Sequence, residues 1–149
     1  MNILVSACLL GLPCRYDGSS KPREDVLALG GKHVLIPVCP EQLGGLPTPR
    51  PPAEWQGERI VDRAGTDVTE AYLRGAEGAV CIARLCGCTH AILKERSPAC
   101  SCAGIYDGSF SGVLVPGRGS AARALEAAGI TVLGETMLAD LPEQGAGSG

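Results

Sequence analysis

Three cysteines follow short apolar segments of the chain, in positions that could form a metal site. Cys8 and Cys39 each come just after such a segment, and Cys100 follows the apolar residues 91–93 at a short distance. Thiolates are ligands of zinc, which normally has four ligands in structural sites, and of iron–sulfur clusters. Three thiolates on a four-iron cluster would leave one iron open to an atom of a substrate.

A carboxylate and a hydroxyl group accompany two of these thiols. Glu41 is separated from Cys39 only by Pro40, and Ser97 precedes Cys100 in a short segment. A carboxylate at the rim of a metal site can transfer protons. The alternative is that Glu41 is an ordinary acid of a loop or helix start and that Ser97 is a turn serine.

The remaining cysteines leave other interpretations open. The chain has eight cysteines, and Cys86, Cys88 and His90 could form a zinc site with Cys100 and Cys102. The two Cys-X-Cys pairs lack the Cys-X2-Cys spacing that is typical of zinc sites, which weakens that interpretation. A zinc- or cluster-binding module without enzymatic activity, such as a redox sensor or a sulfur carrier, stays as the alternative function.

A glycine-containing turn offers another alternative. Gly117 and Gly119 precede an expected helix, and the amides at a helix N-terminus can bind a phosphate group. A small nucleotide-binding protein is therefore a further interpretation. A lone Gly-X-Gly pair is a weak signal, and a simple turn between a strand and a helix explains it as well.

The elements that must position these residues alternate between strands and helices. Apolar segments predict the strands, and helical spacing with flanking Gly and Pro predicts the helices. The expected strands are residues 3–5, 34–38, 91–93, 113–115 and 130–133, and the expected helices are residues 22–29, 69–85 and 120–129. This order predicts an α/β fold with an open, mostly parallel, Rossmann-like sheet and helices on both faces. Ligands of such sheets bind beyond the carboxyl ends of the strands, so the three thiols should meet there if their strands are neighbours.

Smaller features lie between these elements. Asp67 and Glu70 form a capping-box pattern at the start of the 69–85 helix, in which Cys81 is expected to be buried. The Gly- and Pro-rich residues 44–56 predict a long loop, and residues 58–68 predict a small hairpin that turns at residues 63–65. The sequence Tyr-Asp-Gly-Ser occurs at residues 16–19 and again at residues 106–109, which we interpret as two independent turns.

The composition limits the classes of protein to consider. The 149 residues suit one domain, expected at residues 1–141, with a flexible tail at residues 142–149. A net charge of −3 without a basic stripe disfavours a long nucleic-acid partner. The apolar run at residues 3–12 is too short to span a membrane, and no basic segment precedes it. We therefore expect a cytoplasmic protein with reduced thiols, and the sequence leaves the oligomeric state open.

Four blocks of the sequence resemble the thiouracil desulfidase family in its short, single-domain form. The resemblance extends over nearly the whole chain, to about residue 135. The blocks are SACLLGLPCRYDG at residues 6–18, PVCPEQLGGLPTPRPP at residues 37–52, DVTEAYLRGA at residues 67–76 and LKERSPAC at residues 93–100, followed by IYDG.

The resemblance implies an α/β enzyme with a 4Fe-4S cluster held by only three cysteines, here Cys8, Cys39 and Cys100. It implies that the fourth iron takes the sulfur of a thiolated pyrimidine, and that water replaces this sulfur at carbon without net redox change. Cys14 and Cys102 are further thiols that stand close to these motif cysteines.

The resemblance also implies roles for residues that bear no thiol. Glu41 would activate the water or relay its proton, and Ser97 would protonate or hydrogen-bond the ring. Tyr16, Arg50 and Lys94 stand in the same blocks and are expected to bind the substrate. That substrate would be a small thio-base or thionucleotide, such as thiouracil or 4-thiouridine monophosphate.

Overall fold

A four-stranded parallel sheet lies at the centre of the fold in the computed structural model, which describes residues 1–142. The strand order is β2-β1-β5-β8, and every neighbouring pair is parallel. The strands are β1 (Asn2–Ser6), β2 (Val34–Val38), β5 (His90–Leu93) and β8 (Thr131–Gly134). These are four of the five predicted strands, and the prediction of an open parallel sheet is confirmed.

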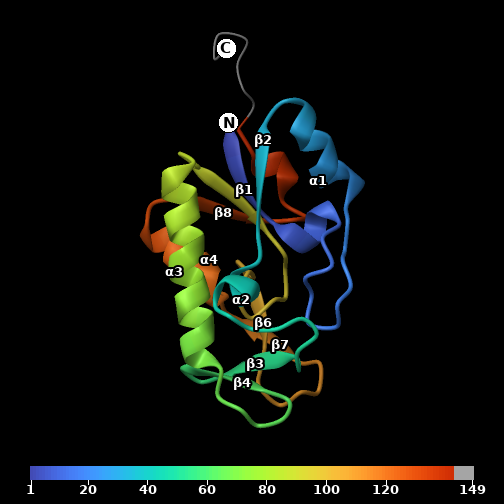
Figure 1. Cartoon of the computed structure of the whole chain (residues 1–149), viewed down its shortest axis with the longest axis vertical. Helices are drawn as coiled ribbons and strands as arrows, with labels where there is room; N and C mark the ends of the chain where they lie inside the picture. Colours follow the sequence, from blue (N-terminus) through green and yellow to red (C-terminus); the bar gives the residue numbers. More distant parts are fainter. Residues whose placement is uncertain (143–149) are drawn as a thin grey trace.

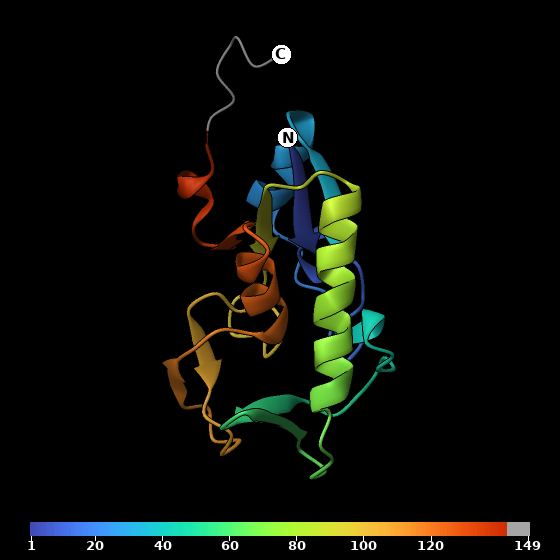
Figure 2. The same cartoon turned by 90° about the vertical axis from the view of Figure 1, so that its left-hand side faces the viewer.

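Helices cover both faces of this sheet, as predicted (Figures 1 and 2). Side chains of β1 alternate between the faces, as they must in a strand. Ile3 and Val5 pack with Val26 of α1 (Glu24–Ala28) on one face. Leu4 points to the other face, where it belongs to a core with α3 (Thr69–Leu85) and α4 (Ser120–Ala127).

Helix α3 has the predicted bounds because its apolar residues recur at helical spacing. Tyr72, Ala76, Ala79 and Ala83 are buried against the sheet. The predicted capping box is wrong, because Val68 is the N-cap and the cap has no side-chain hydrogen bond. Asp67 lies one residue earlier, and its Oδ1 accepts the N–H of Thr69 at 2.9 Å. Cys81 faces outward and is exposed, so its predicted burial is wrong.

The short helix α2 (Pro40–Leu43), which the sequence did not predict, packs closely on α3. A proline in the first turn suits a helix start. The two helices approach at glycines, since a Cβ added to Gly75 would overlap the carbonyl oxygen of Pro40, and one added to Gly44 would overlap that of Ala71. Because Gly75 has no side chain, the residues that follow β2 can lie in close contact with α3.

Replacing Gly75 by alanine is expected to lower the free energy of unfolding by about 1–3 kcal/mol, the usual cost of overpacking. Gly78 is the matched control, because it lies in the same helix and its added Cβ would meet only the side chain of Leu43, at 3.4 Å. Gly78→Ala should be neutral or stabilising, by up to about 1 kcal/mol of helix propensity. Chemical denaturation measures both variants, and equal stabilisation by both would contradict the close contact.

Two antiparallel hairpins lie beyond the carboxyl ends of the sheet strands (Figures 1 and 2). They are β3 (Ala53–Gln56) with β4 (Arg59–Asp62), and β6 (Gly104–Tyr106) with β7 (Leu114–Pro116). The hairpin predicted at residues 58–68 is therefore misplaced, because its first strand lies in the predicted loop and its turn is at residues 57–58. A buried carboxylate, Glu54, breaks the apolar pattern of β3. The chain does turn again near Gly65, whose N–H donates to the carbonyl oxygen of Asp62.

The strand predicted at residues 113–115 does not join the main sheet. It corresponds to β7, whose three residues are all exposed and which pairs only with β6. An apolar triplet without alternation cannot distinguish a sheet strand from an exposed hairpin strand.

The remaining elements are short. Within residues 1–142, the other elements are three short 3-10 helices, η1 (Ala7–Leu10), η2 (Leu29–Gly31) and η3 (Leu138–Asp140). Of the tail predicted at residues 142–149, residues 143–149 lie outside the described residues. Over residues 1–142, no helix combines the length and the apolar character that crossing a membrane requires.

A thiol-lined candidate active site

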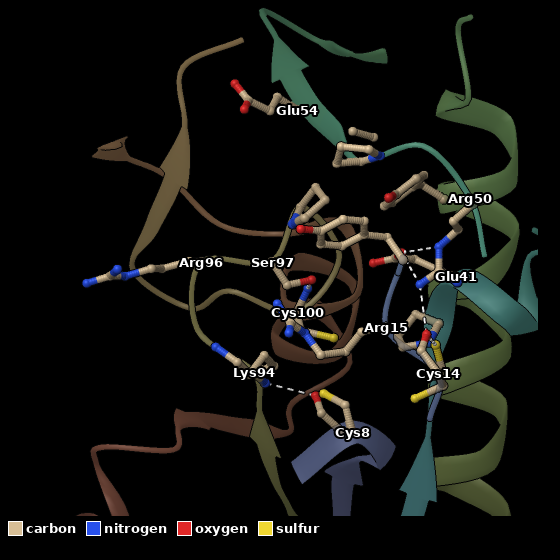
Figure 3. A pocket seen from close by; sticks show the side chains of 18 of the residues that line it. Cys8, Cys14, Arg15, Glu41, Arg50, Glu54, Lys94, Arg96, Ser97 and Cys100 are labelled. Atoms are coloured by element: carbon tan, nitrogen blue, oxygen red, sulfur yellow. Dashed lines mark hydrogen bonds and ion pairs between the residues drawn. The ribbon is translucent and has the colours of Figure 1, made fainter. Parts of the chain in front are cut away.

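The carboxyl ends of three adjacent strands bring Cys8, Cys39 and Cys100 to one cavity. Cys8 lies in η1 after β1, Cys39 directly follows β2, and Cys100 lies in the loop after β5. All three line a cavity of about 580 Å³, in which Figure 3 labels Cys8 and Cys100. They meet because β2, β1 and β5 are neighbours and parallel, so their carboxyl ends share one edge.

Cys14 adds a fourth thiol to this cavity. It is only 6% exposed, and its thiol contacts those of Cys8 and Cys39. The thiol of Cys39 also donates to the carbonyl oxygen of Cys14 at 3.7 Å. Cys102, the other thiol close to the motif cysteines, lies instead with its Sγ 3.7 Å from the Sδ of Met137.

The environment keeps the thiols of Cys39 and Cys100 protonated when no cation is near. Burial raises the pKa of Cys100 to about 12, although hydrogen bonds with Ser6 and Ser97 act in the opposite direction. Contact with the Cys14 thiol, and then burial, raise the pKa of Cys39. A bound metal deprotonates its thiol ligands. A set of soft sulfur donors in a buried cavity therefore fits a thiophilic group such as an iron–sulfur cluster.

The zinc arrangement considered from the sequence is wrong. His90 begins β5, whereas Cys100 follows the other end of that strand, so the strand separates the two halves of the proposed set. Across residues 1–142, no three His, Cys, Asp or Glu side chains are grouped closely enough to hold a single metal ion. Thiolates of an iron–sulfur cluster bind to its separate iron atoms, so they need not meet around one point.

Glu41 enters the same cavity from the first turn of α2. Its Oε2 is 2.7 Å from Nε and 2.6 Å from Nη2 of Arg50. Tyr72 of α3, which is 2% exposed, also lines this part of the cavity. Burial, and then the negative charge of Glu41, raise the pKa of Tyr72, so its hydroxyl stays protonated. A carboxylate is thus held beside the thiols by one cation.

Ser97 organises the turn that carries Cys100. Its Oγ accepts the N–H groups of Ala99 and Cys100, both at 3.1 Å. Ser97 therefore does act as a turn serine. Its hydroxyl also hydrogen-bonds with the thiol of Cys100, and the side chain lines the cavity.

The start of α4 holds the same turn from behind. The N–H groups of residues 119–121 donate to the carbonyl oxygens of Ser101, Pro98 and Ala99 at 2.7, 3.0 and 2.8 Å. These amides are occupied, so the nucleotide-binding turn considered from the sequence is wrong. A Cβ on Gly119 would overlap the backbone of Ala99 and Cys100, which explains the glycine.

The three residues that are expected to bind the substrate, Tyr16, Arg50 and Lys94, all line the cavity. They differ in exposure and in the protein groups that they contact. Tyr16 is 40% exposed at the rim. The Nζ of Lys94 is 3.0 Å from the carbonyl oxygen of Glu95 and 3.5 Å from Oε2 of the buried Glu135. Arg50 is buried and binds Glu41 together with several backbone and side-chain oxygens.

Several residues that line the cavity were not predicted from the sequence, namely Arg15, Glu54, Arg63, Tyr106 and Phe110. The repeated Tyr-Asp-Gly-Ser was the signal that could have found some of them. Both copies form the same turn, in which Asp17 and Asp107 each accept the N–H of the serine two residues later, at 3.0 and 2.9 Å. The turns bring Tyr16 and Tyr106 to the same cavity.

A family model and a solved structure point to one family, and a curated relative is similar over nearly its whole length. The family model described as 2-thiouracil desulfurase matches residues 3–137. The uncharacterized protein YbbK of Bacillus subtilis (strain 168) is 41% identical to this chain over an alignment of length 149. The alignment covers 93% of this chain and 99% of YbbK. A solved structure of the 4Fe-4S-dependent thiouracil desulfidase TudS is 48% identical, with a TM-score of 0.89 and coverage of 94% of both chains.

Proposed function

This chain belongs to the 2-thiouracil desulfurase family, and on that premise we propose that it is an iron–sulfur-dependent desulfidase of thiolated pyrimidines. One water supplies the oxygen that replaces sulfur on the ring, and the sulfur leaves as hydrogen sulfide. The atoms balance without an oxidant or a reductant. The observation that carries the proposal is that Cys8, Cys39 and Cys100 line the same cavity as Glu41.

We assign these three cysteines as the ligands of a 4Fe-4S cluster. The soft donors, the burial of Cys8 and Cys100 and the origin of all three thiols at strand ends support the assignment. When bound, the cluster supplies an iron without a protein ligand, a Lewis acid for the sulfur of the substrate. Cys14 stays outside this set as a neighbouring thiol.

We assign Glu41 as the base that accepts the proton of the attacking water. Its carboxylate lies in the cavity, and a carboxylate can accept the proton of a water as that water attacks carbon. We assign Ser97 as the residue that hydrogen-bonds the ring, because its side chain lines the cavity and the N–H groups of Ala99 and Cys100 hold its Oγ in place. Glu41 thus acts on the water, and Ser97 acts on the substrate.

The size and charge of the cavity favour a small thiopyrimidine, either free or as a nucleotide. About 580 Å³ is within the range of small-molecule pockets. Arg15 and Arg63 lie over the rings of Tyr16 and Phe110, at 5.7 and 5.6 Å to the ring centroids. Within residues 1–142, neither arginine forms an ion pair, so both can bind an anionic substituent such as a 5′-phosphate.

Arg96 points away from the thiols (Figure 3). Lys94 and Tyr16 would contact the base or sugar.

If Arg15 and Arg63 bind a phosphate, replacing either by alanine is expected to raise the KM for 4-thiouridine monophosphate about tenfold, the loss of one charge-assisted hydrogen bond. The KM for thiouracil should change less than about twofold, because that substrate has no phosphate. Arg59→Ala is the control, since Arg59 is exposed and pairs with Asp67 away from the cavity. Equal KM changes for both substrates would contradict a phosphate contact.

Anaerobic reconstitution with iron and sulfide tests the proposed function. The reconstituted protein should become brown and release sulfide from thiouracil with formation of uracil. We place the protein in the cytoplasm, whose reducing conditions resemble those of this experiment. Labelled oxygen from water should appear in the uracil. A colourless protein that contains stoichiometric zinc and turns over no thio-base would support the non-enzymatic module instead.

A further inference from the structure

Arg50 is buried at the junction of three segments of the site. Its side chain is 5% exposed, and that of its partner Glu41 is 13% exposed. The segments are α2 with Glu41, the loop after η1 with Cys14, and residues 47–48, which precede Arg50 itself. Figure 3 shows Arg50 directed at Glu41 and at the loop of Cys14.

This guanidinium makes four hydrogen bonds and one ion-pair contact with groups of the protein. Nε and Nη2 both bind Oε2 of Glu41, at 2.7 and 2.6 Å. Nη2 also donates to the carbonyl oxygen of Cys14 at 2.9 Å. Nη1 donates to Oγ1 of Thr48 at 3.0 Å and to the carbonyl oxygen of Pro47 at 3.3 Å. Four of the five N–H donors of the arginine thus form hydrogen bonds within the protein, and all three nitrogens are directed at protein oxygens.

Two of these partners link Arg50 to the thiols. The carbonyl oxygen of Cys14, which Arg50 holds, is also the acceptor of the Cys39 thiol. Glu41 follows Cys39 in the chain after one proline. A single cation therefore fixes the carboxylate and the loop of Cys14 relative to Cys39.

We propose that Arg50 is a positioning residue that acts through Glu41, in place of the substrate contact expected from the sequence. It binds one carboxylate oxygen with two nitrogens, so the carboxylate is oriented before substrate arrives. A planar, forked group is needed for this, which an ammonium group cannot replace. The inference rests on the proposed function, because it concerns how the base of that reaction is held.

A double-mutant cycle tests this role in the reconstituted enzyme. Arg50→Lys should lower kcat by about tenfold or more and leave KM within about twofold, since the lost contact orients the base and not the substrate. In the Glu41→Gln background, the same change should cost less than about twofold, because a residue that acts through Glu41 has no effect without it. Arg59→Lys, at an exposed ion pair, should behave as wild type.

Two kinetic outcomes would overturn the proposal. A rise in KM at unchanged kcat would make Arg50 a substrate contact. Fully additive losses in Arg50→Lys and Glu41→Gln would show that the two residues act independently.

A measurement on the metal-free protein separates this inference from the proposed function. The Nε–H of Arg50 should give a slowly exchanging NMR signal in the wild type, because it is buried and donates to a carboxylate. Glu41→Gln should shift this signal and speed its exchange. An unchanged signal would refute the contact even if the enzyme is active, and the expected shift would support it even if thiouracil is not turned over.

Discussion

Cys39→Ala is expected to abolish both the visible absorbance of the cluster and sulfide release after anaerobic reconstitution. Cys39 directly follows β2, and its thiol is one of only three that we assign to the cluster. Without Cys39, only the thiolates of Cys8 and Cys100 would remain, and we expect these two to be too few to retain a four-iron cluster. Iron analysis and the visible spectrum of the reconstituted variant measure the effect.

Cys81→Ala is the matched control for this experiment. Cys81 is an exposed thiol of α3 that does not line the cavity, so its variant should take up iron and release sulfide as the wild type does. A Cys39→Ala protein with the full iron content of the control would show that Cys39 is not a ligand, and Cys14 would then be the thiol to examine.

Glu41→Gln should keep the cluster absorbance and lose about 10²–10⁴-fold in kcat, the usual contribution of a positioned acid or base. The amide has nearly the shape of the carboxylate but cannot accept the proton of the water. Because Glu41 provides no thiol, the iron content should stay at the wild-type value. Steady-state release of sulfide from thiouracil measures the rate.

Glu58→Gln provides the comparison, because Glu58 is an exposed acid in the turn between β3 and β4. Its rate should equal that of the wild type. If Glu41→Gln were as active as Glu58→Gln, another group would have to take the proton, and the assignment of Glu41 would be wrong.

The elements of the main sheet could be predicted because their signals are local. Residues 34–38 form a strand with the predicted bounds, and residues 69–85 form a helix with the predicted bounds. Each depends on a run or a period of apolar side chains. The β3–β4 hairpin gave no such signal, because Glu54 in β3 is buried to accept the N–H groups of Gly108 and Phe110, which are remote in sequence.

The candidate site was predictable to the extent that it depends on strand ends. Cysteines after β1, β2 and β5 share a cavity because these strands are parallel neighbours. The alternation of elements indicated parallel strands, but it left the order of the strands in the sheet open. The partners of Arg50 could not be predicted, because they come from three segments whose approach depends on the packing of α2 against Gly75. The direction of a side chain is a property of that packing and not of the local sequence.

Mössbauer spectroscopy of the wild-type protein, reconstituted anaerobically with isotopically enriched iron, tests the central claim most directly. Three cysteine ligands on a 4Fe-4S cluster should make one iron distinct from the other three, and thiouracil should change the signal of that iron. The absence of a cluster, or four irons in one all-cysteine environment that thiouracil leaves unchanged, would contradict the account.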